Sequence, residues 1–306
     1  MNQPTDFVLA FDFGGTKMAI ATADRSGQRL GHVELPTRPS DGAPQALDRA
    51  VVAGHSLAEA ASENGGTLLG IGVSTMGVTL EDSVVMAPNV PGWERQAIPK
   101  MMRRAFSTDS VRVANDVKAA ARAEIRWGSL RCIDTGIYLN LGTGIGAALV
   151  VGGRVVEGAH GAAGEIGYNL RQLHQDEGAW SGRVPLEEFV GGGAIAARIA
   201  RRFGSQATPD TVYAAIETSV EAREFVEEIM TEIAFHLSNL TIALDPSRIS
   251  VAGGLMRSQD VVLPRLQAHV RRFVPFPPEV VTGSFLLDGG LMGGIALGLE
   301  AAGEES

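Results

Sequence analysis

Two glycine turns between apolar segments are the first features of the sequence that suggest chemistry. The first is Asp12-Phe13-Gly14-Gly15-Thr16-Lys17 and the second is Leu141-Gly142-Thr143-Gly144-Ile145-Gly146. A glycine turn exposes successive backbone N–H groups, which bind phosphate oxygens without many cations. The sequence therefore predicts phosphate-binding residues at Gly14, Gly15, Thr16, Lys17, Gly142, Thr143 and Gly144.

Three side chains of the first turn fit phosphate chemistry. Thr16 adds a hydroxyl group and Lys17 a positive charge, and the whole chain has only two other lysines, Lys100 and Lys118. Asp12 is predicted to hold Mg²⁺ through water, because Mg²⁺ prefers carboxylates together with its own hydration shell. The alternative reading is that Asp12 and the threonines only satisfy the backbone of a turn.

Two rival phosphate motifs are excluded. The sequence contains no Gly-Lys-Ser or Gly-Lys-Thr, so it has no P-loop. Residues 142–147 formally fit the dinucleotide-binding pattern, but that pattern requires a helix after the glycines. Here an apolar segment and Gly152-Gly153 follow, which indicates a strand and a turn.

Strands and helices must position these turns, and their expected order alternates. Strands are expected at 7–11, 18–22, 31–35, 68–73, 111–113, 136–141, 145–151, 248–251 and 279–282. Helices are expected at 43–63, 116–127, 191–203, 209–217, 221–244, 259–273 and 290–300. This alternation predicts an α/β fold. The similar hairpins around the two glycine turns suggest two related halves.

Composition narrows the class of protein. The 306 residues include 26 Lys and Arg against 35 Asp and Glu, a net charge of −9, which argues against a nucleic-acid partner. Cys132 is the only cysteine, which excludes a disulfide framework and a multi-cysteine metal site. No segment is long and apolar enough for a membrane span, and the first residues lack the pattern of a signal peptide. A cytoplasmic protein is expected.

Six segments in the same order carry a resemblance to a known family. They are residues 12–17, Ala87-Pro88-Asn89-Val90-Pro91-Gly92-Trp93, Asn115-Asp116, residues 141–146, residues 158–167 and Val251-Ala252-Gly253-Gly254. Together they resemble the ROK family (repressors, uncharacterised frames and sugar kinases) of the hexokinase/actin-like superfamily. The resemblance covers nearly the whole chain.

The resemblance implies a fold and an activity. The fold would be the two-domain, actin-like and ribonuclease H-like duplicated fold with an interdomain active-site cleft. Its small domain would be residues 1–114 plus 288–306, and its larger domain residues 115–287. The activity would be transfer of the ATP γ-phosphate to a hexose, with Mg²⁺, by a homodimer.

The resemblance also implies roles for individual residues. Asp116 would be the general base. The sugar would be bound by Asn115, Glu165 and Glu187, with Asn89 and Gly77 on the same side. Gly253 and Gly254 would approach the adenosine. From local sequence alone, Asn115 and Asp116 are equally suited to cap a helix, and the glutamates to lie on the surface.

The sequence departs from the family pattern at three places. Tyr168 stands where many relatives have a zinc-binding histidine, and residues 169–184 contain no cysteine, so no structural zinc is expected. Lys118 stands where the family often has asparagine. Ser74-Thr75-Met76-Gly77 replaces the frequent Pro-Gly turn.

Several functions fit these residues. The 6-OH of glucose is the first choice of acceptor, with fructose, mannose and N-acetylhexosamines as alternatives, and polyphosphate as an alternative donor. A sugar-responsive ROK regulator without a DNA-binding domain is a second possibility, since no helix-turn-helix segment is expected ahead of Asp12. A third is a non-kinase ATPase of the actin-like superfamily.

Overall fold

The structure is a computed structural model that describes residues 5–63, 65–87 and 90–304. Its contacts divide the chain into two compact units, and each is described by itself. Unit 1 comprises Met1–Trp127, Glu157–Ala162 and Asp288–Ser306. Unit 2 comprises Gly128–Val156 and Ala163–Leu287.

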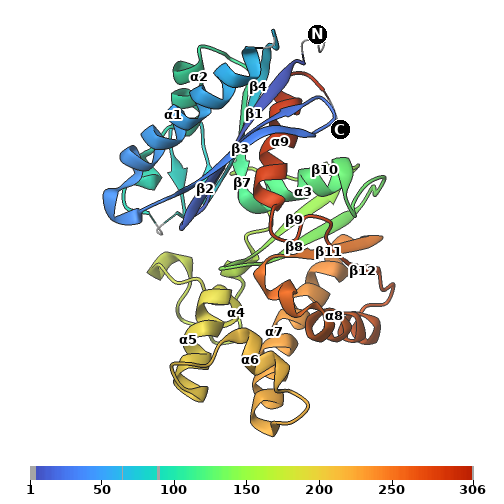
Figure 1. Cartoon of the computed structure of the whole chain (residues 1–306). Coiled ribbons are helices and arrows are strands. Elements are labelled where there is room, and N and C mark those ends of the chain that lie inside the picture. The colour runs from blue at the N-terminus through green and yellow to red at the C-terminus, as the bar shows by residue number, and fades with distance from the viewer. Residues whose placement is uncertain (1–4, 64, 88–89, 305–306) are drawn as a thin grey trace. The chain divides into compact units, whose positions relative to one another are not determined.

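Unit 1 is built on a five-stranded sheet with the strand order β3-β2-β1-β4-β7. Strands β1, β2 and β3 are antiparallel, whereas β4 and β7 continue parallel to β1 (Figure 1). The bounds are β1 Phe7–Phe13, β2 Lys17–Asp24, β3 Arg29–Pro36, β4 Leu68–Thr75 and β7 Val111–Asn115. A separate small hairpin consists of β5, Val78–Thr79, and β6, Val84–Val85.

Helices cover both faces of this sheet. Successive residues of β1 point to opposite faces and pack into two different hydrophobic clusters. Leu9, Phe11 and Phe13 pack with residues of α1, whereas Val8 and Ala10 pack with α9. All seven residues of β1 are apolar except Asp12, which agrees with a strand buried on both sides. The helices of unit 1 are α1 Ala43–Ser62, α2 Ile98–Phe106, α3 Asp116–Trp127 and α9 Gly289–Ala301.

Helix α3 belongs with unit 1 because it packs closely on α9. A Cβ added to Gly293 of α9 would lie 2.2 Å from the carbonyl carbon of Ala119 in α3, so only glycine allows this approach. The sequence-based boundary between residues 114 and 115 differs from this division, since α3 and Glu157–Ala162 group with the first unit.

Unit 2 contains a second five-stranded sheet, with the order β10-β9-β8-β11-β12. Strands β8 and β9 form an antiparallel hairpin, and β11 and β12 continue parallel to β8. The bounds are β8 Gly136–Leu141, β9 Ile145–Val151, β10 Arg154–Val155, β11 Arg248–Ala252 and β12 Glu279–Thr282. Each unit thus repeats one topology, an antiparallel hairpin followed by two parallel strands, which confirms two related α/β halves.

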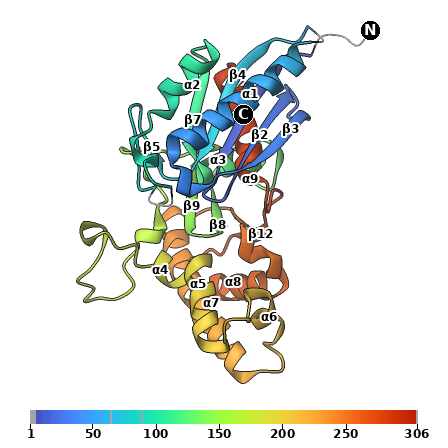
Figure 2. The same ribbon diagram turned by 60° about the vertical axis from the view of Figure 1, so that its left-hand side comes forward.

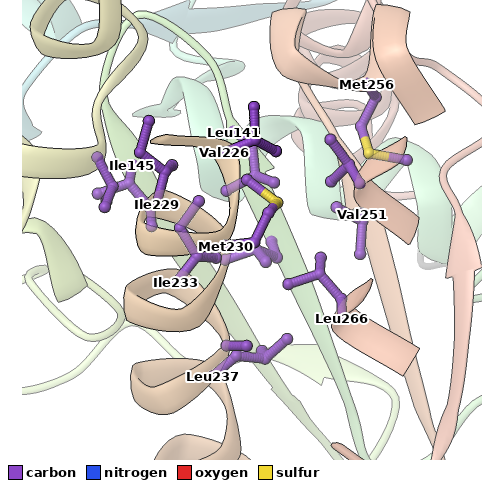
Figure 3. Packing of buried hydrophobic residues seen from close by; sticks show 14 of the residues in the cluster. Leu141, Ile145, Val226, Ile229, Met230, Ile233, Leu237, Val251, Met256 and Leu266 are labelled. Carbon is purple, nitrogen blue, oxygen red and sulfur yellow. The ribbon is translucent and has the colours of Figure 1, made fainter. Parts of the chain in front are cut away.

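The core of unit 2 forms against one long helix, α7. Its buried residues Val226, Ile229, Met230, Ile233 and Leu237 recur at helical spacing and face the sheet (Figure 3). Across from them lie residues of the sheet and of α8, among them Leu141, Val251 and Leu266. The helices of unit 2 are α4 Glu187–Val190, α5 Gly192–Phe203, α6 Pro209–Ala214, α7 Val220–Leu244 and α8 Gln259–Phe273.

Candidate active site

The first glycine turn joins β1 to β2 in unit 1. The Gly14 N–H donates to the carbonyl oxygen of Lys17 (3.0 Å), and the Thr37 hydroxyl donates to the carbonyl oxygen of Gly14 (2.7 Å). A Cβ on Gly14 would lie 2.8 Å from the Lys17 carbonyl oxygen, so a larger residue would distort the turn. The Thr16 and Lys17 side chains are exposed, and Lys17 Nζ donates to Glu34 Oε1 at 2.7 Å. Exposed ion pairs contribute about 0–1 kcal/mol to stability, so Lys17 can leave Glu34 for a phosphate group at little cost.

The second glycine turn joins β8 to β9 in unit 2. The Gly142 N–H donates to the carbonyl oxygen of Gly144, two residues on (3.0 Å), whereas the Gly14 N–H of the first turn donates to the residue three positions on. The Glu187 carboxylate lies against this turn, because its Oε2 accepts from the Ile145 N–H at 3.1 Å. A Cβ on Gly144 would lie 2.0 Å from the same Oε2. The Glu187 carboxylate, one of the predicted sugar-binding groups, is therefore held directly at this turn.

Gly253 lies beside the end of β8 in the same unit. Its φ of +98° suits glycine, and a Cβ there would lie 2.5 Å from the carbonyl carbon of Leu141. Gly254 is exposed, with nothing within 4 Å of an added Cβ. The structure thus brings Gly253 next to the turn that begins at Gly142, and its nucleotide-binding role stays a prediction.

Asn115 and Asp116 lie where β7 ends and α3 begins. The buried Asn115 accepts a hydrogen bond through Oδ1 from the Lys118 N–H (2.8 Å), so it caps the helix. The Asp116 carboxylate is exposed, and its Oδ1 accepts from the Val117 N–H at 2.9 Å. The capping reading is therefore confirmed for Asn115, and the neighbouring carboxylate faces solvent.

Asp12 is the carboxylate of the first turn. Burial raises the pKa of Asp12 from 3.8 to about 6, and the negative charges of Asp116 and Asp288 add to the shift. A hydrogen bond opposes it, because the Ser74 hydroxyl donates to Asp12 Oδ1 at 2.8 Å. The register of β1, β4 and β7 likewise brings Asp12 and Asp116 to the same end of the sheet of unit 1.

The surroundings of Asp12 fit a magnesium ion. A cation offsets the repulsion between the buried Asp12 carboxylate and the charges of Asp116 and Asp288, and Mg²⁺ commonly uses one or two carboxylates, with waters and substrate phosphates completing its shell. A Cβ on Gly290, at the start of α9, would lie 2.4 Å from Asp12 Oδ1, so glycine there leaves space for the carboxylate. In the described part of the chain, no group of three or more His, Cys, Asp or Glu side chains is arranged to hold a metal. Asp12 stays the predicted Mg²⁺ ligand.

Glu165 lies in a segment of unit 2 that contacts the start of α4. Gly164, at φ +89°, comes so near β9 that a Cβ would lie 1.9 Å from the Ala147 carbonyl oxygen. Glu165 follows and precedes the 3₁₀ helix η3, Ile166–Tyr168. A Cβ on Gly167 of this helix would lie 3.3 Å from the Glu187 Cβ. The two predicted sugar-binding glutamates thus come from segments in direct contact.

The remaining predicted sugar-side residues are less informative. Gly77 occupies a turn at φ +78°, where a Cβ would lie 2.6 Å from the Val85 carbonyl oxygen. This requirement accounts for the glycine without any ligand. Asn89 lies outside the described residues. Trp93 is fully buried against Phe13, with ring centroids 5.4 Å apart, so it is a packing residue.

A family comparison of the whole chain adds the deciding observation. The model described as "ROK family" matches residues 8–301. The chain belongs to the ROK family.

Two relatives and one solved structure are similar to this ROK protein over most of its length. The N-acetyl-D-glucosamine kinase of Yersinia pseudotuberculosis serotype O:3 (strain YPIII) is 31% identical over 285 residues, which cover 87% of this chain and 91% of the relative. A glucokinase of Halalkalibacterium halodurans is 26% identical over 301 residues, covering 90% and 88%. A ROK family glucokinase from Streptomyces griseus, solved with glucose and AMPPNP, has a TM-score of 0.79 at 23% identity and covers 96% of this chain and 99% of that chain. The solved structure shows a shared fold.

The structure of this ROK protein shows supporting residues that the sequence did not single out. Gly191, Gly192 and Gly193 lead into α5, and the N–H groups of the last two donate to the carbonyl oxygens of Gly142 and Thr143. A Cβ on Gly192 would lie 2.5 Å from the Gly142 carbonyl oxygen. The sequence shows three consecutive glycines here, but nothing near them indicates that they contact the second glycine turn.

Among the described helices, none is long and apolar enough to cross a bilayer.

Lys118 is a second unexpected feature of the ROK chain. Its ammonium group is only 2% exposed and donates to the carbonyl oxygens of Gly161 (2.6 Å) and Glu157 (2.8 Å), and to Glu157 Oε2 (3.1 Å). Burial by itself raises the pKa of Glu157, but Arg122 and Lys118 outweigh burial and lower it. Lys118 therefore ties Glu157–Ala162 to α3, two residues after Asp116.

Replacing this lysine should destabilise the protein strongly. We expect Lys118→Met to lower the free energy of unfolding by about 3 kcal/mol, because it removes a buried donor that bonds to two carbonyl oxygens and pairs with Glu157. Lys100→Met is the matched control, since Lys100 forms an exposed pair with Asp82 and its loss should cost about 0–1 kcal/mol. Urea denaturation followed by circular dichroism measures both. Equal midpoints for the two variants would contradict the assignment of Lys118 as a buried tether.

Proposed function

We propose that this chain is an ATP-dependent sugar kinase that transfers the γ-phosphate to a hexose hydroxyl, with the 6-OH of glucose as the first choice and Asp116 as general base. Membership of the ROK family and the sugar-kinase names of its relatives support the reaction class. One observation carries the assignment of the base. In the parallel strands β1, β4 and β7, Phe13 pairs with Thr75 and Thr75 pairs with Asn115, so the exposed Asp116 follows its strand at the same end of the sheet as the first glycine turn.

The proposed reaction needs a base because a sugar hydroxyl is a poor nucleophile. Asp116 accepts the hydroxyl proton as the sugar oxygen bonds to the γ-phosphorus, and the bond from phosphorus to the bridging oxygen of ADP breaks. A positioned base contributes about 10²–10⁴-fold. The backbone N–H groups of the two glycine turns hold the phosphate oxygens, and Lys17 adds a positive charge. Asp12 would hold Mg²⁺, which would neutralise part of the triphosphate charge.

Three side chains are proposed to bind the hexose. Glu165 and Glu187 offer carboxylate oxygens to sugar hydroxyls, and Asn115 offers its amide. Glu187 already accepts from the Ile145 N–H through Oε2, so its other oxygen, Oε1, is the one assigned to the sugar. Asn89 and Gly77 are retained as further sugar-side residues on the family resemblance alone. Gly253 and Gly254 are assigned to the adenosine of ATP, and polyphosphate is the alternative donor.

The acceptor is proposed within a short set of sugars. The named relatives divide between glucose and N-acetyl-D-glucosamine as acceptors, so these two are tested first. Fructose and mannose follow as alternatives. The family resemblance is also the basis for proposing a homodimer in the cytoplasm, and light scattering tests the dimer.

A screen for ADP release over these sugars tests the proposal. With ATP and Mg²⁺, one hexose should stimulate ADP release well above the rate without sugar, and a chelator should abolish the stimulation. Sugar should be required because a kinase that completes its site only around the acceptor limits hydrolysis by water. Equal ADP release with and without every sugar would contradict a kinase and favour an ATPase.

A further inference from the structure

Helix α4 needs contacts from outside to hold its position. It has only four residues, Glu187–Val190, and so short a helix is not stable by itself. It nevertheless carries Glu187, whose Oε2 accepts from Ile145 at the second glycine turn. In Figure 2 the yellow-green segment before α4 runs out as a long loop. Contacts made by the other residues of α4 therefore contribute to the position of Glu187.

Phe189 of α4 is contacted by two arginines. The guanidinium carbon of Arg171 lies over its ring at 3.4 Å from the centroid, and that of Arg198 lies over the same ring at 4.0 Å. Arg198 also donates through Nη1 to the Phe189 carbonyl oxygen at 3.2 Å. Such cation–π contacts are stronger where water is excluded from them. Phe189 is thus held through its ring by a residue of the preceding loop and by α5.

Two glutamates of α7 neutralise these arginines. Arg171 Nε donates to Glu232 Oε1 at 2.6 Å, and Arg198 Nη2 donates to Glu228 Oε2 at 2.7 Å. Glu228 and Glu232 are four residues apart and lie one turn from each other on the same side of the helix. Helix α7 also supplies the buried row from Val226 to Leu237 in the core, so it is a firm anchor (Figure 3).

We propose that these five residues form a positioning cluster that holds α4 and orients Glu187 toward the sugar. The five are Arg171, Phe189, Arg198, Glu228 and Glu232. The part that concerns the sugar rests on the proposed function, whereas the part that concerns Glu187 and the glycine turn does not. These side chains act through Glu187 and are positioning residues, not catalytic ones.

The first test replaces the ring. We expect Phe189→Leu to raise the sugar KM by about tenfold, with the ATP KM within about twofold, because two cation–π contacts are lost from the sugar side. Phe189→Tyr keeps the ring and should restore the sugar KM. Arg171→Gln, in the loop, is a milder variant expected to raise the sugar KM by about threefold.

The matched control is Arg183→Ala. Arg183 lies in the same segment and pairs with Glu188 and Glu177, but these pairs are exposed. Its loss should leave both KM values within about twofold. An equal rise in sugar KM for Arg183→Ala and Phe189→Leu, or no rise in Phe189→Leu, would overturn the cluster.

Hydrogen exchange separates the cluster from the proposed function. In Phe189→Leu, the Ile145 amide should exchange at least about fivefold faster, because Glu187 no longer stays in place to accept its N–H. The same amide should be unchanged in Arg183→Ala and in Phe189→Tyr. If wild-type protein phosphorylates no sugar, the proposed function fails while this exchange result still decides the cluster. Unchanged exchange in Phe189→Leu would contradict it.

Discussion

The Asp116→Asn variant should lose about 10²–10⁴-fold in kcat while its sugar affinity stays within several-fold. Asparagine keeps the size and the hydrogen-bonding oxygen that accepts from the Val117 N–H, so α3 should still begin at this residue. It cannot take the proton of the sugar hydroxyl. The coupled ADP assay gives kcat, and calorimetric titration with the sugar gives the dissociation constant.

Asp109→Asn is the control for this variant. Asp109 is an exposed carboxylate just before β7, at the opposite end of the strand from Asp116. Its replacement should leave kcat within about twofold, as is usual for surface substitutions. Wild-type turnover in Asp116→Asn would remove Asp116 as the base.

The Asp12→Asn variant should show opposite effects on activity and stability. Activity should fall by about 10²-fold or more, because the carboxylate that would hold Mg²⁺ near the triphosphate is gone. Without Mg²⁺, the same variant should be more stable than wild type at pH 7.5. Ser74 can still donate to the amide oxygen of the new residue, so the hydrogen bond at 2.8 Å has an equivalent.

The sign of this stability change follows from the raised pKa. The folded protein holds the Asp12 proton up to about pH 6, whereas the unfolded chain releases it near 3.8. Between these values the folded state binds more protons, so stability falls as the pH rises, by about 3 kcal/mol at most. Asparagine removes this penalty, and the advantage should disappear below about pH 4.

Urea denaturation at pH 4 and pH 7.5, with a chelator present, measures the Asp12 effect. Adding Mg²⁺ should then stabilise wild type more than Asp12→Asn, since ligands that bind only the folded state raise its stability. Equal stability of the two proteins at both pH values would contradict a raised pKa for Asp12 in the folded protein.

Local sequence predicted the parts of the site that lie within one turn. The glycine turns at 12–17 and 141–146 are found between the expected strands, because apolar runs around glycines restrict the chain to a hairpin. The cap at Asn115 also follows from local spacing. Helix α2 was not expected, although Pro99 in its first turn is a typical start signal.

Long-range contacts account for what the sequence did not reveal. Glu187 was expected among the sugar-binding residues, but its contact with Ile145 joins residues 42 positions apart. Phe189 and Glu232 are likewise linked through Arg171, which appears in the sequence as an ordinary surface residue. The boundary between the units also depends on a long-range contact. Helix α3 groups with unit 1 through its packing on α9, near the C-terminal end of the sequence.

The most direct test of the sugar-kinase assignment is the product itself. Wild-type protein is incubated with ATP, Mg²⁺ and each hexose, and ADP and hexose phosphate are quantified together by mass spectrometry. We expect one hexose to yield hexose phosphate and ADP in equal amounts, and Asp116→Asn to yield almost none of either. Formation of ADP without any hexose phosphate would contradict phosphoryl transfer to a sugar.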